Sequence, residues 1–215
     1  MTGQPAPLTP SPASQPLSDN YFHDMYAAAN DPWGFSERWY ERRKYALTLA
    51  SLSSERYRRA FEPGCSIGVL SAELALRADH LVCMDLSPRA TELARQRLAR
   101  HTGHVEVVTG NFIVDWPDGE FDLIVLSEIL YYLTPTQLDD LIRGLPRSLS
   151  PDGEVVAVHW RHTVSEYPQS GDDVHDRLLA SDLVHSAGYR DTDLRLDLFG
   201  REPRRSIAER EDLVG

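Results

Sequence analysis

The sequence is poor in the residues that hold a polyanion. Lys44 is its only lysine, and 22 basic residues stand against 33 acidic ones, which gives a formal net charge of −11. Nucleic-acid binding depends on Lys and Arg side chains that neutralise phosphates, so we expect no nucleic-acid partner. Long apolar runs are also missing. None reaches the roughly 18 residues of a membrane-spanning helix, and we expect no membrane insertion.

Cysteine is scarce as well. Cys65 and Cys83 are the only two, and neither belongs to a CxxC or other metal-ligand spacing. The N-terminus lacks the charged-then-apolar layout of a signal peptide. Both features favour a cytoplasmic protein with reduced thiols. The sequence leaves the oligomeric state open.

Four regions of the chain differ in amino-acid composition. Residues 1–19 are rich in Pro, Ser and Ala and have almost no large apolar groups, so they cannot offset the entropy cost of ordering and are expected to be disordered. Residues 20–54 carry an aromatic cluster and an amphipathic helix, which favours a cap. Residues 55–200 are the predicted main domain, and 201–215 are expected to form a polar tail.

The main domain alternates short β-rich runs with helical ones. This pattern is typical of an α/β fold with helices around a mostly parallel sheet. We expect helices at 87–100 and 134–149, the first with Ser87 as N-cap and Pro88 at its first position. The expected strands are 57–64, 80–86, 105–111, 121–128, 153–160, 183–189 and 194–200.

The run Glu-Pro-Gly-Cys-Ser-Ile-Gly at 62–68 follows the first expected strand. In parallel α/β sheets, ligands collect beyond the carboxyl ends of the strands, where the strand order reverses. Gly64 and Gly68 lack a Cβ, so the backbone can turn tightly and let a ligand approach closely. Asp85 lies about 20 residues further on, where a carboxylate can accept both hydroxyls of a ribose. The pattern predicts a nucleoside-binding site.

Two nucleoside cofactors compete for such a site, a dinucleotide and S-adenosylmethionine. A dinucleotide requires G-x-G-x-x-G with a helix N-terminus facing the pyrophosphate. Glu62 stands inside this turn, where its carboxylate would repel pyrophosphate but attract the cationic amino-acid end of S-adenosylmethionine. Two glycines alone would fit an ordinary strand-to-helix turn. Glu62 and Asp85 in register favour S-adenosylmethionine.

With these residues, the region 55–200 resembles the class I S-adenosylmethionine-dependent methyltransferases. Their first motif, E-x-G-x-G-x-G, is present at 62–68 with Ser66 in place of the middle glycine. The resemblance implies an α/β, Rossmann-like fold with a mostly parallel seven-stranded sheet, helices on both faces and an antiparallel C-terminal hairpin. It places the ribose on Asp85 and the adenine beside Asn111, where the family usually has Asp. The cofactor-binding residues that it implies are Glu62, Gly64, Cys65, Ser66, Gly68, Asp85, Leu86, Asn111, Phe112 and Ser127.

Segments outside this common core resemble a narrower family, nodulation protein S. They are DPWGFSERWYERRKYALTLA at 31–50, FEPGCSIGVLSAELA at 61–75, HWRHTVSEYPQSGDDVH at 159–175 and SIAERE at 206–211. That family transfers a methyl group to the free amine of an N-deacetylated chitooligosaccharide. The resemblance implies methyl transfer here to the amine of a small molecule, a deacetylated amino sugar or another amine-bearing acceptor.

Such an acceptor must lose a proton, because only a neutral amine has a lone pair to give. Two residues near the carboxyl ends of the fourth and fifth strands are the catalytic candidates. His159 has an ordinary pKa of about 6.5, which suits proton acceptance near neutral pH. Glu128 could attract and orient the cationic ammonium. Each also has a structural interpretation, His159 as a hydrogen-bonded strand-end residue and Glu128 as a partner of backbone amides.

The acceptor is expected among aromatic and basic side chains. Sugars bind on aromatic faces and an aromatic lid would exclude water, although packing of the cap explains many of the same rings. Arg42, Arg43 and Lys44 are expected mostly on a solvated face, with one of them able to meet the cofactor carboxylate. The substrate-binding candidates are Trp33, Tyr131, Tyr132, Arg161 and His162.

Two other functions would use the same cofactor. One is an O-methyltransferase that acts on a hydroxyl of a natural-product intermediate. The other is a non-catalytic module that binds the cofactor and regulates a partner. The module would leave the runs at 126–132 and 159–162 with structural roles only.

We predict that methyl transfer needs no metal ion. One set of side chains has metal-ligand character: His159, His162, Asp172, Asp173 and His175. On an extended strand, residues three apart face opposite sides, so the first two cannot share an ion without a bend between them. EDTA should leave activity unchanged in a methyl-transfer assay. Activity that is lost with EDTA and restored by a divalent cation would contradict the prediction.

Overall fold

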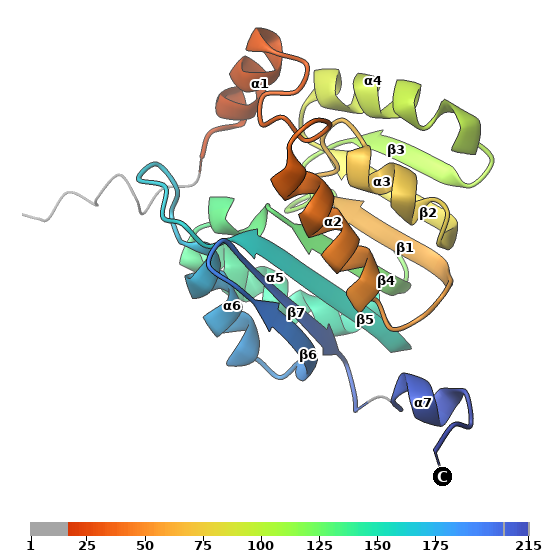
Figure 1. Ribbon diagram of the computed structural model, residues 1–215. Helices are drawn as coiled ribbons and strands as arrows, with labels where there is room; N and C mark the ends of the chain where they lie inside the picture. The colour runs from red at the N-terminus through yellow and green to blue at the C-terminus, as the bar shows by residue number, and fades with distance from the viewer. Residues whose placement is uncertain (1–16, 204, 215) are drawn as a thin grey trace, which may run out of the picture.

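Figure 1 shows the computed structural model, which describes residues 17–203 and 205–214. Most of the tail predicted to be disordered lies outside the described residues, and its last residue opens the first helix, α1 (Asp19–Ala28). No helix in the described ranges is long and apolar enough to cross a membrane. The division into cap, main domain and tail stays a prediction.

One sheet of seven strands organises the chain, in the order β3-β2-β1-β4-β5-β7-β6. Strands β1 to β5 run parallel to one another, whereas β7 is antiparallel to both of its neighbours, β5 and β6. The predicted mostly parallel sheet with an antiparallel C-terminal hairpin is therefore confirmed. The strands are β1 (Tyr57–Pro63), β2 (Ala78–Asp85), β3 (Val105–Thr109), β4 (Phe121–Ser127), β5 (Leu149–Trp160), β6 (Val184–Arg190) and β7 (Leu194–Gly200).

Helices cover both faces of this sheet, as predicted (Figure 1). The alternation of side chains along the strands makes this possible. Along β4, Ile124 and Leu126 belong to one apolar core, whereas Leu123 and Val125 belong to the other. The helices of the first core are α5 (Pro135–Ser148) and α6 (Gly171–Leu179), and those of the second are α2 (Trp39–Ser51), α3 (Val69–Leu74) and α4 (Pro88–Arg97).

Local signals set the start of two helices. Ser87 Oγ accepts a hydrogen bond from Ala90 N at 3.3 Å and Pro88 begins α4, as predicted. α5 begins with a capping box in which the side chains of Thr134 and Gln137 satisfy each other's backbone amides. α4 is shorter than the predicted helix, because the chain tightens after it into a 3₁₀ turn, η2 (Ala99–His101).

β5 begins earlier than the expected strand. The Pro-Asp-Gly run at 151–153 stays within β5 as an irregularity, where the pairing with β4 shifts between Phe121 and Leu123. A Cβ on Gly153 would lie 2.7 Å from Phe121 O, so the close approach of the strands requires glycine there. The predicted polar tail contains one further helical turn, α7 (Ile207–Arg210).

The strand order reverses between β1 and β4. β2 and β3 are added on one side of β1, and β4 to β7 on the other. Loops that leave the carboxyl ends of two such strands diverge and leave room for a ligand between them. Those ends carry the 62–68 loop and the segment that begins at Glu128 and continues into η3 (Leu130–Tyr132).

Buried polar contacts fasten α2 to the sheet. Ser53, just after the helix, donates from N and from Oγ to the Glu154 carboxylate of β5, at 3.0 and 2.7 Å. Tyr57 OH donates to the same carboxylate. Within the helix, Lys44 Nζ donates to Glu128 Oε1 at 2.8 Å. The N-terminal segment thus contributes to the wall of the site at the strand ends.

Candidate active site

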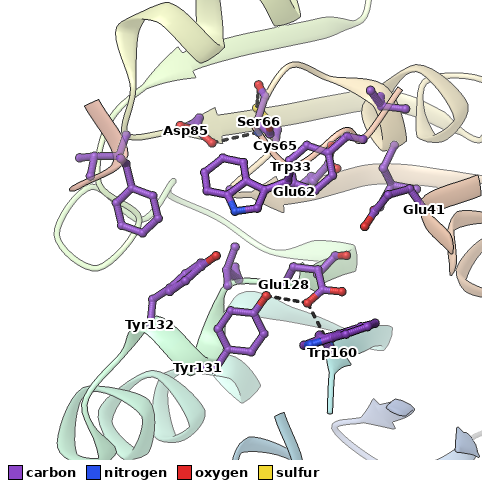
Figure 2. A pocket seen from close by; sticks show the side chains of 18 of the residues that line it. Trp33, Glu41, Glu62, Cys65, Ser66, Asp85, Glu128, Tyr131, Tyr132 and Trp160 are labelled. Atoms are coloured by element: carbon purple, nitrogen blue, oxygen red, sulfur yellow. Dashed lines mark hydrogen bonds between the residues drawn. The ribbon is translucent and has the colours of Figure 1, made fainter. Parts of the chain in front are cut away.

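A cavity of about 740 Å³ lies at the carboxyl ends of β1 and β4, and Figure 2 shows it from close by. It is large enough for a drug-sized ligand with room to spare. The structure brings together thirteen of the seventeen predicted site residues around it and leaves Gly68, His159, Arg161 and His162 outside its lining. The predicted residues that line it are Trp33, Glu62, Gly64, Cys65, Ser66, Asp85, Leu86, Asn111, Phe112, Ser127, Glu128, Tyr131 and Tyr132.

The loop after β1 adopts a left-handed backbone at three positions. Gly64, Ser66 and Gly68 have φ values of 71°, 52° and 75°. Ser66 therefore takes the conformation that the motif's middle glycine would take, at some cost in strain. A Cβ on Gly64 would lie 2.3 Å from Ile129 Cγ2, so glycine lets the loop pack closely against the segment after β4. Gly68 lies instead against Ala94 of α4, which explains its absence from the lining.

Asp85 ends β2 beside this loop. Its carboxylate accepts hydrogen bonds from Ser66 N and Ser87 N, each at 2.9 Å, and Figure 2 shows the first of them. Burial raises the pKa of Asp85 to about 6. A carboxylate has about four acceptor positions, so two remain for a bound ligand.

Glu62 lies at the base of the cavity and is almost fully buried. Its Oε2 accepts a hydrogen bond from Ser71 Oγ of α3. Burial is the main reason that its pKa rises to about 8. A cation that entered this part of the cavity would offset the desolvation of the carboxylate.

Asn111 lines the cavity, but its side chain is engaged locally. Asn111 Oδ1 accepts a hydrogen bond from Ile113 N at 3.0 Å, which closes a turn after β3. An adenine amine that binds this carbonyl oxygen, as predicted, would therefore share it with the amide of Ile113. Phe112, the next residue, adds an aromatic ring to the same wall.

Glu128 follows β4 with a φ of 60°, a strained conformation for a residue with a side chain. Three donors hold its carboxylate: Lys44 Nζ at 2.8 Å, Tyr131 OH at 2.6 Å and Trp160 N at 2.9 Å. Figure 2 shows the last two bonds, which join the ends of β4 and β5. The carboxylate is thus held in one position in the cavity wall.

His159 lies outside the cavity, and its position does not support the predicted role as a base. It is completely buried, and its Nε2 accepts a hydrogen bond from Leu130 N at 3.2 Å. The proton is therefore on Nδ1, which faces His175 Nε2 at 3.0 Å, and His175 Nδ1 in turn faces Asp197 Oδ2 at 2.6 Å. Burial lowers the pKa of His159 well below its usual value. The sequence could not indicate this, because η3 and α6 supply the partners of His159.

Arg161 and His162 do not line the cavity either. Arg161 forms a two-pronged ion pair with Asp172 of α6, with both distances 2.9 Å. His162 Nε2 lies 2.8 Å from Asp193 Oδ1, and Asp193 is the one that lines the cavity. In the part of the chain that the structure describes, no three His, Cys, Asp or Glu side chains are grouped to hold a metal ion.

α2 carries a buried charged cluster that was not predicted from the sequence. Lys44 was expected on a solvated face, but its side chain is 1% exposed and lines the cavity. Its Nζ lies 2.7 Å from Glu41 Oε2 and 2.8 Å from Glu128 Oε1. Glu41, Lys44 and Thr48 recur at helical spacing, but polar residues in this pattern are typical of a solvated face, and only the structure shows that all three are buried.

Aromatic residues before α2 cover the glycine loop. Tyr26 OH of α1 donates to Ser66 Oγ at 2.5 Å, and the Trp33 ring meets the Tyr26 ring edge-on with centroids 5.5 Å apart. Phe22 makes a similar contact with Tyr132, at 5.0 Å. The N-terminal segment therefore touches both sides of the cavity, as expected of a cap.

A buried acid that ends β2 beside a left-handed loop after β1, in a sheet of this order, is typical of the class I S-adenosylmethionine-dependent methyltransferases, and the fold predicted from the sequence is confirmed. A sequence profile decides the family: that of nodulation protein S (NodS) matches residues 19–168. The chain belongs to the NodS family.

Individual relatives agree with this assignment. The crystal structure of N-methyltransferase NodS from Bradyrhizobium japonicum with S-adenosyl-L-homocysteine has a TM-score of 0.75 and 26% identity, and covers 85% of this chain and 97% of that one. A Pseudomonas syringae protein to which methyltransferase activity is attributed is 48% identical, with a TM-score of 0.67, over 76% of this chain and 99% of that one. Nodulation protein S from Rhizobium tropici is 32% identical over 62% of this chain and 59% of its own length. The chain spans about three fifths of the curated relatives that it matches.

We predict that affinity for S-adenosylhomocysteine falls as the pH drops through about 6. Burial raises the pKa of Asp85 to about 6, and only the ionised carboxylate can accept hydrogen bonds from both ribose hydroxyls. The dissociation constant, measured by calorimetry, should rise about tenfold between pH 7 and pH 5.

The Asp85→Asn variant is the control for this pH effect. It should bind more weakly than the wild type, and the ratio of the two dissociation constants should narrow toward pH 5. Any effect of Glu62 on the pH dependence of binding would be the same in both proteins and would cancel from the ratio. A ratio that does not change with pH would contradict the prediction.

His159→Ala should lower the free energy of unfolding. Without the imidazole, Leu130 N and His175 lose their partners in the interior, at about 1–3 kcal/mol for each unsatisfied group. Urea denaturation measures the change. His80→Ala, at an exposed position of β2, should unfold like the wild type. Equal stability of the two variants would show that the buried contacts of His159 contribute nothing.

Proposed function

We propose that the protein transfers a methyl group from S-adenosylmethionine to the free amine of a small molecule, a deacetylated amino sugar or chitooligosaccharide. The observation that carries the proposal is that one cavity has two unlike walls. Asp85 and Glu62 border one wall, and Glu128 with aromatic rings borders the other (Figure 2). The first suits a nucleoside with a cationic amino-acid end, and the second suits a cationic acceptor with flat faces.

The residues of the first wall fit the cofactor. Asp85 keeps two acceptor positions for the ribose hydroxyls, and Glu62 places a carboxyl group near the cationic amino-acid end. Leu86 and Phe112 provide apolar surface for the adenine. When bound, the cofactor supplies a methyl group on a positively charged sulfur.

The residues of the second wall would orient the acceptor. Glu128 presents a carboxylate that three donors hold in place, so it can attract an ammonium without moving. Tyr131 stacks on Tyr167 at 17°, with centroids 5.1 Å apart, and both rings line the cavity. A fixed acceptor behind the methyl carbon saves entropy in the transition state, which can account for a large part of the rate enhancement.

Family membership supports the same reaction type. NodS from Bradyrhizobium japonicum is an N-methyltransferase, and its structure holds S-adenosyl-L-homocysteine. The cap adds a physical reason for a small acceptor, because Phe22, Tyr26 and Trp33 lie over the cavity and limit the room for a bulky one.

We predict that the protein methylates partly N-deacetylated chitooligosaccharides in the presence of S-adenosylmethionine. The product, followed by mass spectrometry under multiple turnover, should carry the methyl group on the free amine. The fully acetylated oligosaccharide is the matched control and should stay unmodified. A methyl group on a hydroxyl would favour an O-methyltransferase, and cofactor binding without turnover on any amine would favour a binding module.

A further inference from the structure

Two carboxylates share one ammonium in the cavity wall. Lys44 Nζ lies 2.7 Å from Glu41 Oε2 and 2.8 Å from Glu128 Oε1. The rings of Phe35, Tyr40 and Tyr45 surround the same ammonium, with centroids 5.8, 5.3 and 5.3 Å from Nζ. Carboxylates and aromatic faces are the groups that bind an ammonium in proteins. This part of the wall, which we call the Lys44 cage, therefore has the chemistry of a cation site.

The two carboxylates of the cage differ in their hydrogen bonds. Three donors occupy Glu128: Lys44, Tyr131 and the backbone of Trp160. Glu41 is only 6% exposed, and two side chains donate to its carboxylate: Lys44, with Nζ 2.7 Å from Oε2, and Tyr45. A carboxylate has about four acceptor positions, so Glu41 keeps more of them free than Glu128 does. Glu41 is thus the carboxylate with capacity left for a ligand.

One buried polar atom of the described residues lacks a partner at the same place. Tyr40 OH has no hydrogen bond within the described residues, although the carboxylates of Glu128 and Glu41 are the charges that act on it most strongly. Tyr40 and Glu41 both line the cavity, and Figure 2 shows the Glu41 side chain pointing toward it. A ligand with an N–H group could donate to both oxygens.

The charges of the cage leave one negative charge to be matched. Lys44 lies between Glu41 and Glu128, so one ammonium faces two carboxylates. Burial raises the pKa of Glu41, with Lys44 opposing the effect. A carboxyl group whose pKa is raised toward that of its substrate is suited to accept a proton.

We propose that Glu41 binds the ammonium of the acceptor and removes its proton, with Tyr40 OH as a second contact and Lys44 as the fixed counter-ion. The inference rests on the proposed function, since it requires an amine acceptor. It gives the role that the sequence analysis had attached to His159 to a residue on α2. Glu41 is thus a catalytic residue, and Lys44 is a positioning residue.

The step balances as follows. The acceptor enters as R–NH₃⁺, and one N–H bond breaks as its proton moves to the Glu41 carboxylate. The lone pair left on nitrogen forms a bond to the methyl carbon, while the carbon–sulfur bond breaks and its electrons return to sulfur. The product is R–NH₂⁺–CH₃ with S-adenosylhomocysteine. Glu41 then loses its proton to water that enters when the products leave.

The Glu41→Gln variant tests the inference. Glutamine keeps the shape of the side chain but neither attracts a cation nor accepts a proton. With a partly N-deacetylated chitooligosaccharide as probe, kcat should fall at least about 100-fold and KM for the probe should rise. Affinity for S-adenosylhomocysteine should stay within about threefold of the wild type, since the inference places no cofactor contact on Glu41. Glu41→Asp, which keeps the carboxylate, should recover part of the rate.

Glu73→Gln is the matched control. It makes the same change at an exposed position of α3 and should leave kcat, KM and thermal unfolding at wild-type values. Thermal unfolding of Glu41→Gln checks that the variant folds. If that variant is unfolded, Tyr40→Phe provides the second test and should raise KM for the probe without changing cofactor affinity.

The measurements distinguish a wrong role for Glu41 from a wrong proposed function. Wild-type kcat and KM in Glu41→Gln would overturn the inference and leave the proposed function intact. Loss of cofactor affinity in parallel with turnover would place Glu41 at the amino-acid end of the cofactor and would also overturn it. A wild-type protein that methylates no amine would refute the proposed function itself.

Discussion

The ion pair between Lys44 and Glu128 is the contact on which the site depends. It joins α2 to the end of β4, two segments 84 residues apart, and both side chains lie in the cavity wall. A buried charge without its partner is strongly destabilising, so neither side chain can be lost alone without disturbing the other. The pair also keeps Glu128 in place despite its strained backbone, and Tyr131 and Trp160 then attach to the same carboxylate. The pair thereby holds α2 against the end of β4 at the cavity.

Burial of the acidic residues has a second effect. Asp85 and Glu62 both have raised pKa values, at about 6 and about 8, because the fold removes them from water before any ligand is present. A carboxyl group with a raised pKa in the folded state opposes folding once the pH exceeds its unfolded value of about 4. A ligand that donates hydrogen bonds or brings positive charge relieves this cost. Part of the free energy of ligand binding therefore comes from relieving the desolvation of Asp85 and Glu62, which is already present in the ligand-free protein.

The sequence predicts best what depends on neighbours along the chain. Gly64, Ser66 and Asp85 were placed correctly, because a strand, a tight turn and a second strand leave little choice of geometry. Lys44 was misplaced because its main partner, Glu128, comes from the far end of β4, and the helix pattern alone reads Lys44 as solvated. His159 was misassigned for the same reason. Its neighbours come from α6 and the segment after β4, and only they decide that the ring is a buried acceptor.

In the row of hydrogen bonds from Leu130 through His159 and His175 to Asp197, every donor points toward Asp197. Leu130 N–H fixes the tautomer of the first ring, the first ring fixes that of the second, and Asp197 accepts at the end. Asp197 also meets His185, whose side chain is 40% exposed. The row therefore fixes both imidazole tautomers and links the segment after β4 to β5, α6 and β7 through hydrogen bonds that begin in the interior and end beside the partly exposed His185.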